Sequence, residues 1–260
     1  MAQTLSTATD AAPQVRRIGV ADLRWALAEG WSDFKEHRGD LLMIGFLYPL
    51  VGLAAAAFAL NGTLMPLLFP LIAGVSLMGP TVAVGFYELA RRREQGLESG
   101  WTHFLDPWRG PSAKELLVST IALGLLFLTW LDVAAQLYQH SFGFNNALTI
   151  QAFLDEMFAT TAGWQLVLIG NFVGLGFAII ALAVSVVTFP MLVDRPVPAV
   201  TAVTTSLRAV AHNPGIIALW GLIVAALLAI GCLPLFIGLA IVMPVLGYAT
   251  WHLYTRLVER

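Results

Sequence analysis

The chain alternates long apolar stretches with short polar ones. A membrane-spanning helix needs about 20 consecutive, mostly apolar residues, and six stretches meet this length: 41–60, 64–89, 115–138, 164–190, 215–232 and 235–257. The connections after the first and fifth stretches are only a few residues long, and short connections join neighbouring antiparallel helices. The pattern therefore predicts an all-α polytopic membrane protein whose six transmembrane helices form three hairpins.

A shorter apolar stripe with helical spacing precedes each pair of stretches. The three stripes are Leu23, Leu27, Trp31 and Phe34; then Leu97, Trp101, Phe104, Leu105 and Trp108; then Val200, Val203, Leu207 and Val210. Such a stripe, interleaved with polar residues, predicts an amphipathic interfacial helix before each hairpin. We therefore divide the chain into a disordered cytoplasmic tail at 1–19 and a single six-span membrane domain at 20–260. Its three units are 20–95, 96–196 and 197–260.

The first and third units resemble each other most closely. The second apolar stretch of each contains a proline, Pro80 or Pro244, followed eight residues later by a polar side chain, Glu88 or His252. This match predicts parallel repeats in which Glu88 and His252 occupy equivalent depths. Between the third and fourth stretches, apolar residues with helical spacing at 150–158 predict one further short amphipathic helix, on the outer side of the membrane.

The charges support a membrane location and give it an orientation. Only 12% of the residues are charged, against about 25% in a soluble domain, so polar side chains cannot cover a water-soluble globule of this size. All 14 Lys and Arg residues fall before the first stretch, in every second gap, or at and after the end of the sixth stretch. This asymmetry predicts a multi-pass protein of the bacterial inner membrane with cytoplasmic N- and C-termini. The net charge of −2 favours no nucleic-acid partner.

Four polar side chains within the apolar stretches are candidate functional residues, because such groups are costly in a membrane. Asp132 and Asn171 lie at similar depths in neighbouring stretches, where the amide could donate a hydrogen bond to the carboxylate. This pair suits either a proton or cation site or a structural clamp, and we favour the clamp. Glu88 and His252 could form a proton relay or could anchor two helices at the interface, which we favour.

Motifs for catalysis and for cofactor binding are lacking in the sequence. It has no glycine-rich phosphate loop, no HExxH and no GxSxG, and its five histidines are spread along the chain. One cysteine excludes an intrachain disulfide or a thiolate metal cluster. We therefore expect no catalytic residue, no metal and no cofactor, haem included.

Three segments resemble the DUF2189 family of bacterial predicted integral membrane proteins. They are 79–92 with its Tyr-Glu-Leu-Ala-Arg-Arg ending, 190–195 with Pro-Met-Leu-Val-Asp-Arg, and 213–254. The resemblance covers nearly everything after residue 20 and implies a membrane protein without an assigned activity.

The expected function is that of a non-catalytic integral membrane protein, an accessory or assembly factor of an envelope complex. Its expected partners are the lipid bilayer and other membrane proteins. The alternative is a small-solute or ion transporter or channel, which a polar cavity reaching mid-membrane would favour. A third class, an enzyme acting on lipid, needs a polar cluster at one interface, and Glu88–Arg91 and Asp194–Arg195 come nearest to one.

Overall fold

The computed structural model describes residues 13–36, 50, 52–54, 57, 67–143 and 150–260. Within these residues the regular secondary structure is helical, as predicted, and only an isolated bridge between Val15 and Val258 pairs extended segments. The helices are α1 (Val20–Glu36), α4 (Leu68–Leu77), α5 (Gly79–Val82), α6 (Val84–Glu94), η2 (Trp101–His103), η3 (Asp106–Arg109), α7 (Ala113–Phe142), α8 (Ile150–Ala159), α9 (Thr161–Ser185), α10 (Thr188–Asp194), α11 (Ala199–His212), α12 (Pro214–Cys232) and α13 (Leu239–Leu257).

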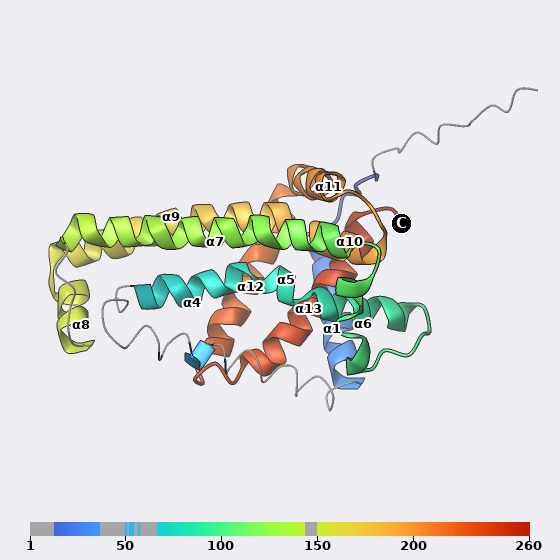
Figure 1. Ribbon diagram of the computed structural model, residues 1–260, viewed down its shortest axis with the longest axis horizontal. Helices are drawn as coiled ribbons and strands as arrows, with labels where there is room; N and C mark the ends of the chain where they lie inside the picture. Colours follow the sequence, from blue (N-terminus) through green and yellow to red (C-terminus); the bar gives the residue numbers. More distant parts are fainter. Residues whose placement is uncertain (1–12, 37–49, 51, 55–56, 58–66, 144–149) are drawn as a thin grey trace, which may run out of the picture.

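Two long helices, α7 and α9, lie side by side and form a rod, with α4 along it and α8 at its far end (Figure 1). The indole N–H of Trp130 on α7 donates a hydrogen bond of 2.8 Å to the Pro70 carbonyl on α4. Glycines make room for the large aromatic rings, because a Cβ at Gly74 would lie 2.3 Å from Phe127. At Gly174 on α9 a Cβ would lie 2.9 Å from Trp130.

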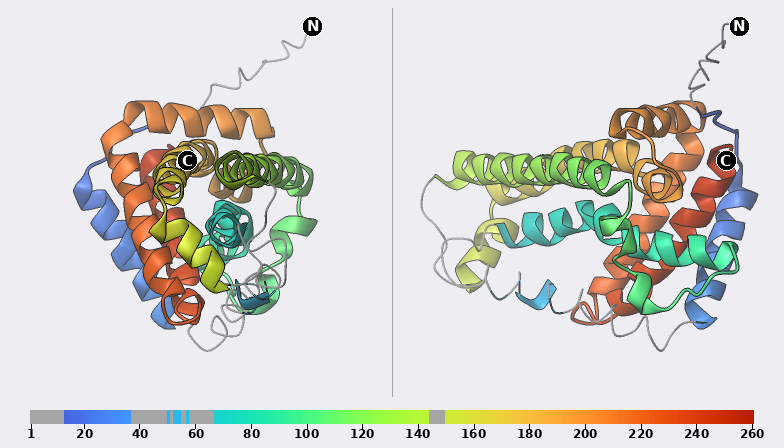
Figure 2. Two further views of the ribbon diagram at one scale, coloured as in Figure 1. Left: turned by 90° about the vertical axis from the view of Figure 1, so that its left-hand side faces the viewer. Right: turned by 45° about the vertical axis from the view of Figure 1, so that its right-hand side comes forward.

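The opposite end of the rod meets a second group of helices made of α1, α6, α12 and α13. Here α1 packs along α13, and Figure 2 shows α11 lying across one side of the molecule. Gly30 permits this close approach, since a Cβ there would lie 2.6 Å from the backbone nitrogen of Ala249. The fully buried Trp220, Trp251 and Tyr254 form part of the core in this region.

The stretch before α1 is held against the other end of the chain. The side chain of Asn213, between α11 and α12, donates to the Arg16 carbonyl at 3.0 Å and accepts from the Ile18 N–H at 2.9 Å. The Arg16 N–H also donates to the Leu257 carbonyl at 2.8 Å. The Asn-Pro-Gly segment at 213–215 therefore ties the chain before α1 to the start of α12, besides separating two helices.

Among the residues that the structure describes, three helices are long and apolar enough to cross a membrane: Ala113–Phe142, Thr161–Asp194 and Pro214–Cys232. They correspond to the third, fourth and fifth predicted stretches. The predicted first stretch, 41–60, lies mostly outside the described residues. The sixth forms α13, whose second half is more polar because it contains His252 and Arg256.

The second predicted stretch, 64–89, does not form one continuous helix. It is divided into α4, α5 and α6, because Pro80 begins a new helix at α5. Proline lacks the N–H needed to continue a helix but suits its first turn. Pro244, in contrast, lies inside the continuous helix α13, so these two prolines act differently and the repeat of the first and third units stays a prediction.

The orientation of α12 differs from that expected in a simple bundle. Figure 1 shows α12 running across the direction of α7 and α9, and the left view of Figure 2 shows α7 and α9 end-on with α12 lengthwise. The arrangement of six spans as three hairpins therefore stays a prediction.

The structure has an α-helix at two of the three predicted amphipathic stripes, α1 and α11, and a further one, α8, at 150–158. The prediction of a continuous helix at the middle stripe, residues 97–108, was wrong. Residues 97–108 contain only the short 3-10 helices η2 and η3. The extended backbone at Gly100 and the proline at 107 interrupt helical hydrogen bonding there.

Candidate functional site

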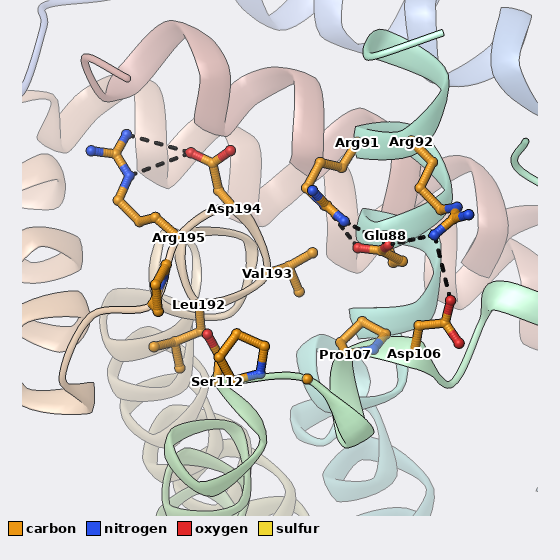
Figure 3. Close-up of a pocket in the computed structure, with 13 residues that line it drawn as sticks. Glu88, Arg91, Arg92, Asp106, Pro107, Ser112, Leu192, Val193, Asp194 and Arg195 are labelled. Atoms are coloured by element: carbon orange, nitrogen blue, oxygen red, sulfur yellow. Dashed lines mark hydrogen bonds and ion pairs between the residues drawn. The ribbon is translucent and has the colours of Figure 1, made fainter. Parts of the chain in front are cut away.

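A cleft of about 390 Å³ opens where α6, η3, the start of α7 and α10 meet. Figure 3 shows its lining, which brings together segments more than a hundred residues apart in the sequence. The charged lining residues are Glu88, Arg91, Arg92, Asp106, Asp194 and Arg195. The two charged pairs that the sequence singled out as nearest to an interfacial polar site, Glu88–Arg91 and Asp194–Arg195, thus share one cleft.

One wall of the cleft is an ion-pair network centred on Glu88. This carboxylate accepts two hydrogen bonds from Arg91, at 2.8 Å from Nε and 2.7 Å from Nη2, and its side chain is only 4% exposed. Arg92 lies 3.6 Å from the same carboxylate and 3.5 Å from Asp106. Asp106 is in turn 2.7 Å from the Nδ1 atom of His103. The network joins α6 to η2 and η3.

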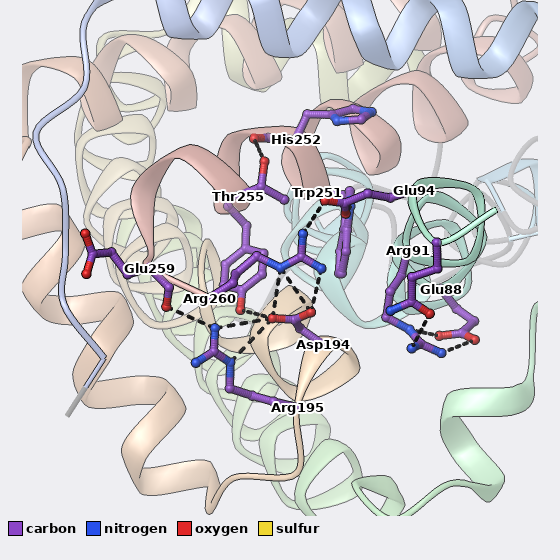
Figure 4. Close-up of polar contacts among 12 residues, drawn as sticks. Glu88, Arg91, Glu94, Asp194, Arg195, Trp251, His252, Thr255, Glu259 and Arg260 are labelled. Carbon is purple, nitrogen blue, oxygen red and sulfur yellow. Dashed lines mark hydrogen bonds and ion pairs between the residues drawn. The ribbon is translucent and has the colours of Figure 1, made fainter. Parts of the chain in front are cut away.

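The opposite wall is centred on Asp194, at the end of α10. Its carboxylate accepts a 2.8 Å hydrogen bond from the Tyr254 hydroxyl and a 2.8 Å bond from Nη2 of Arg260, whose Nε also contacts both carboxylate oxygens (Figure 4). Arg260 also pairs with Glu94 on α6, and its guanidinium lies 5.2 Å from the centre of the Trp251 ring. Asp194 therefore connects α10, α13 and the last residue of the chain.

Arg91 and Arg260 remain protonated in this environment. The bidentate hydrogen bond to Glu88 raises the pKa of Arg91 and outweighs the opposing effect of burial. Burial lowers the pKa of Arg260, but its hydrogen bonds to Asp194 and Glu94 have the larger combined effect and raise it. Both guanidiniums are thus fixed positive charges at the edge of the helical core.

His252 belongs to a different network from Glu88, so the structure does not bring together the Glu88–His252 relay that the sequence left as the less favoured alternative. The Nε2 atom of His252 lies 2.8 Å from the buried carboxylate of Asp33 on α1, which also pairs with Arg93 at 2.6 Å. The ring of His252 contacts Trp25 edge-to-face at 5.5 Å. The histidine therefore joins α13 to α1, and Glu88 has arginines from its own helix.

The predicted hydrogen bond between Asp132 and Asn171 was also wrong. Asp132 accepts a 2.7 Å bond from Gln136, one turn further along α7. The Asn171 amide donates a 2.7 Å bond to the Val167 carbonyl of its own helix, α9. Both side chains are exposed on the outside of the rod, and each bonds within its own helix because its helical face points away from the neighbouring helix.

The residues that the structure describes offer no candidate metal site, and their second cavity is small and mainly apolar. No group of three or more His, Cys, Asp or Glu side chains is placed to hold a metal ion there. A second, smaller cavity of about 90 Å³ lies among the helix breaks near Pro80 and Val186 and has a mainly apolar lining. The larger, charged cleft is therefore the candidate functional site.

Sequence reasoning missed Asp33, Tyr254 and Arg260 as members of the polar networks. Asp33 had a detectable signal, because an acidic residue lies in the otherwise apolar stripe of α1 between Trp31 and Phe34. Arg260 had none, because its partners lie 66 and 166 residues away in the chain.

The helical fold and its three long apolar helices define an integral membrane protein. Residues 68–194 match the model of the family "Predicted integral membrane protein (DUF2189)", which confirms the family expected from the sequence. The match is narrower than the resemblance suggested, because it ends at Asp194 and leaves out residues 213–254. It includes both Glu88 and Asp194, the centres of the two walls of the cleft. Neither the curated proteins nor the solved structures contain a match to this chain.

Proposed function

We propose that this chain is a non-catalytic protein of the bacterial inner membrane that acts as an accessory or assembly factor of an envelope complex. The observation that carries this proposal is the polar surface on the outside of the α7–α9 rod. Asp132, Gln136 and Asn171 are exposed there. An ionisable side chain facing lipid is costly, whereas a polar group on the helix of another membrane protein would offset that cost.

The small share of each long helix that is buried within the chain supports the same proposal. In the most apolar part of the three candidate spans, only 22%, 33% and 17% of the residues are buried. Large side chains on α9, including Trp164, Leu168 and Phe172, are exposed. These faces must be covered by lipid tails or by other proteins, and the polar groups among them favour a protein on at least one face.

We further propose six spans with both termini in the cytoplasm. Besides the sequence asymmetry, the structure supports this orientation by gathering basic residues from distant parts of the chain. Arg91 and Arg195, from two separate gaps, line the same cleft at one end of the rod, and Arg260, which follows the sixth stretch, bonds to Asp194 in its wall. A single basic end is expected on the cytoplasmic side of the membrane.

Site-specific photo-crosslinking in native membranes tests the accessory role. A photoreactive residue at position 172, beside Asn171, should give one protein adduct of discrete mass. The same group at position 222 of α12, where Leu222 is similarly exposed and apolar, serves as the matched control and should give mainly lipid adducts. Asn171→Ala should weaken the adduct at position 172, while lipid adducts alone at both positions would contradict the proposal.

A transporter or channel is the second candidate function. The observation in its favour is the meeting of two helix breaks, near Pro80 and Val186, with the proline-containing part of α13 around the 90 Å³ cavity. Broken helices can expose carbonyl groups to an ion within the membrane. The small volume and mainly apolar lining of this cavity make transport the weaker proposal. Proton or cation flux through the purified protein in vesicles would reverse that order.

A further inference from the structure

The exposed side of α9 follows a seven-residue repeat. With Gln165 as position a of a heptad labelled a to g, every residue at positions a, d, e and g between 164 and 179 is exposed. The residues at positions b, c and f over the same range are half-buried, and Phe177 among them contacts Trp130 of α7. The large side chains at the centre of the exposed side are Leu168, Phe172, Leu175 and Ile179. Their alternating spacing of four and three residues is typical of a helix that packs against a second helix in a left-handed coiled coil.

Two glycines of α9 differ in what their missing side chains make room for. A Cβ at Gly174 would lie 2.9 Å from Trp130, so this glycine serves packing within the chain. A Cβ at Gly176 would meet no atom within 4 Å, and Gly176 is exposed. Glycine weakens the interior of a helix, and no contact with the described residues offsets that cost at Gly176. Because a glycine on the surface of a membrane helix lets a second helix approach closely, Gly176 suits a contact outside the chain.

Two amide side chains on the same face suit a protein partner better than lipid. Gln165 at position a and Asn171 at position g are both exposed. Asn171 donates one hydrogen bond to the Val167 carbonyl, which leaves its second N–H and its own carbonyl oxygen for a partner. An amide both donates and accepts hydrogen bonds, so Gln165 can pair with an identical side chain across a two-fold axis. A polar side chain at a single a position also specifies how two helices align.

The spacing along this face fits a second copy of the same chain. All copies of a chain enter the membrane in the same orientation, so two copies of α9 would run parallel. In a parallel pair, position g of one helix lies beside position e of the other, five residues further along the chain. Trp164 would therefore lie beside Ile169 of the second copy, and Asn171 beside Gly176 of the second copy. A large apolar side chain meets another one, and the amide enters the space that the glycine leaves.

We propose that the chain forms a two-fold symmetric homodimer through α9, with its a and d positions at the contact and Asn171 of each copy against Gly176 of the other. This homodimer rests on the proposed function, because it names the partner of the α9 face on which that function depends. Asp132 and Gln136 lie on the neighbouring helix α7. They are left for a different membrane protein of the envelope complex.

Two neighbouring positions of α9 separate the dimer contact from the rest of the helix surface. Ile179 at position a and Ile180 at position b are the same residue type at nearly the same depth, and they are 56% and 49% exposed. In a background with the native cysteine replaced, Cys232→Ser, one cysteine is introduced by Ile179→Cys or by Ile180→Cys. Oxidation in native membranes should link the Ile179→Cys chains into a species of twice the mass of one chain. The Ile180→Cys chains should stay monomeric, because only position a faces its own copy across the two-fold axis.

Energy transfer between fluorescently labelled full-length chains in lipid vesicles measures the strength of the dimer. Gly176→Leu and Gly124→Leu add the same side chain at positions where a Cβ meets no atom within 4 Å, so both variants should remain folded. The dissociation constant of the dimer should rise about tenfold or more in Gly176→Leu and stay within about twofold in Gly124→Leu, which lies on α7. In Asn171→Leu it should rise about threefold, as expected for the loss of one hydrogen bond between membrane helices.

The possible outcomes distinguish the homodimer from the accessory role. Equal linking at positions 179 and 180, or no linking at position 179, would overturn the homodimer, and so would equal dimerisation of Gly176→Leu and Gly124→Leu. A photo-crosslinked adduct at position 172 with the mass of a different protein would also overturn it but would leave the accessory role in place. Lipid adducts alone at position 172 would contradict both. The same photoreactive group at position 136 of α7 tests the accessory role separately, since an adduct with a different protein is expected there whether or not α9 dimerises.

Discussion

Asp194 offers the sharpest test of the network that connects α10 to the end of the chain. In an Asp194→Asn variant the side chain keeps its size and one carbonyl oxygen, which can still accept the hydrogen bond from Tyr254. The change removes the negative charge that faces Arg260. It also turns an amide nitrogen toward the guanidinium groups, which only donate hydrogen bonds.

The expected loss can be worked out from the contacts. Arg260 makes hydrogen bonds of 2.8 and 3.2 Å to the carboxylate, and the Asp194 side chain is only 9% exposed. A hydrogen bond to a charged group contributes about 1.5–3 kcal/mol, and breaking a fully buried ion pair costs about 3–5 kcal/mol. Arg260 retains Glu94 and is 27% exposed, so solvent compensates in part. We expect the free energy of unfolding to fall by about 2–3 kcal/mol.

Thermal unfolding in detergent micelles measures this change. A loss of that size corresponds to a decrease in Tm of about 5–10 °C, at about 2–4 °C per kcal/mol for a chain of this length. Glu259→Gln is the matched control, because the Arg16–Glu259 pair is about half exposed on both sides, and its loss should shift Tm by no more than about 2–3 °C. The reasoning fails if Asp194→Asn is as stable as Glu259→Gln, or if Arg260→Gln destabilises the Asp194→Asn variant as much as it destabilises the native protein.

Three further predictions test topology, packing and the polar surface. Reporter fusions at both termini should be cytoplasmic and a fusion at Asn146 external, and a cytoplasmic signal at Asn146 would refute the six-span topology. Gly30→Ala should lower Tm, because its Cβ would lie 2.6 Å from the Ala249 backbone; Gly124→Ala, with no atom within 4 Å of its Cβ, should raise stability by about 0.5–1 kcal/mol. Asp132→Asn should cost only about 0.6 kcal/mol and leave a folded protein. A proton flux in vesicles that this folded variant lacks would favour the transporter over the accessory role.

The apolar pattern allowed the sequence to predict most of the helices. The stretches at 115–138, 164–190 and 215–232 reappear as α7, as α9 with α10, and as α12, because a long apolar run has the same helical solution wherever it packs in a membrane. The stretch at 64–89 was predicted less well. Its length suggested one span, but Pro80 divides it, and the sequence did not reveal whether a proline would break a helix or, as with Pro244, be tolerated within it.

The candidate site was only partly visible in the sequence. Glu88 and Asp194 stood beside arginines, which marked them as polar clusters, but nothing local showed that the two clusters line one cleft. The predicted Asp132–Asn171 pair was wrong, and the alternative Glu88–His252 pair is not formed, for the same reason. The sequence predicts at what depth in the membrane a side chain lies, but not in which direction it faces. In the structure Asp132 faces outward from α7, and His252 on α13 faces Asp33.

The sequence by itself determined that this protein is helical, that it belongs in a membrane and that its basic residues are segregated. These properties depend on composition and on periodicity along the chain, which need no knowledge of neighbours. The tertiary structure alone decided the partners of each charge and the cleft that they line. Ion pairs such as Arg260 with Asp194 join residues 66 positions apart, and the short range of such contacts requires the packed helices to bring both groups within about 3 Å.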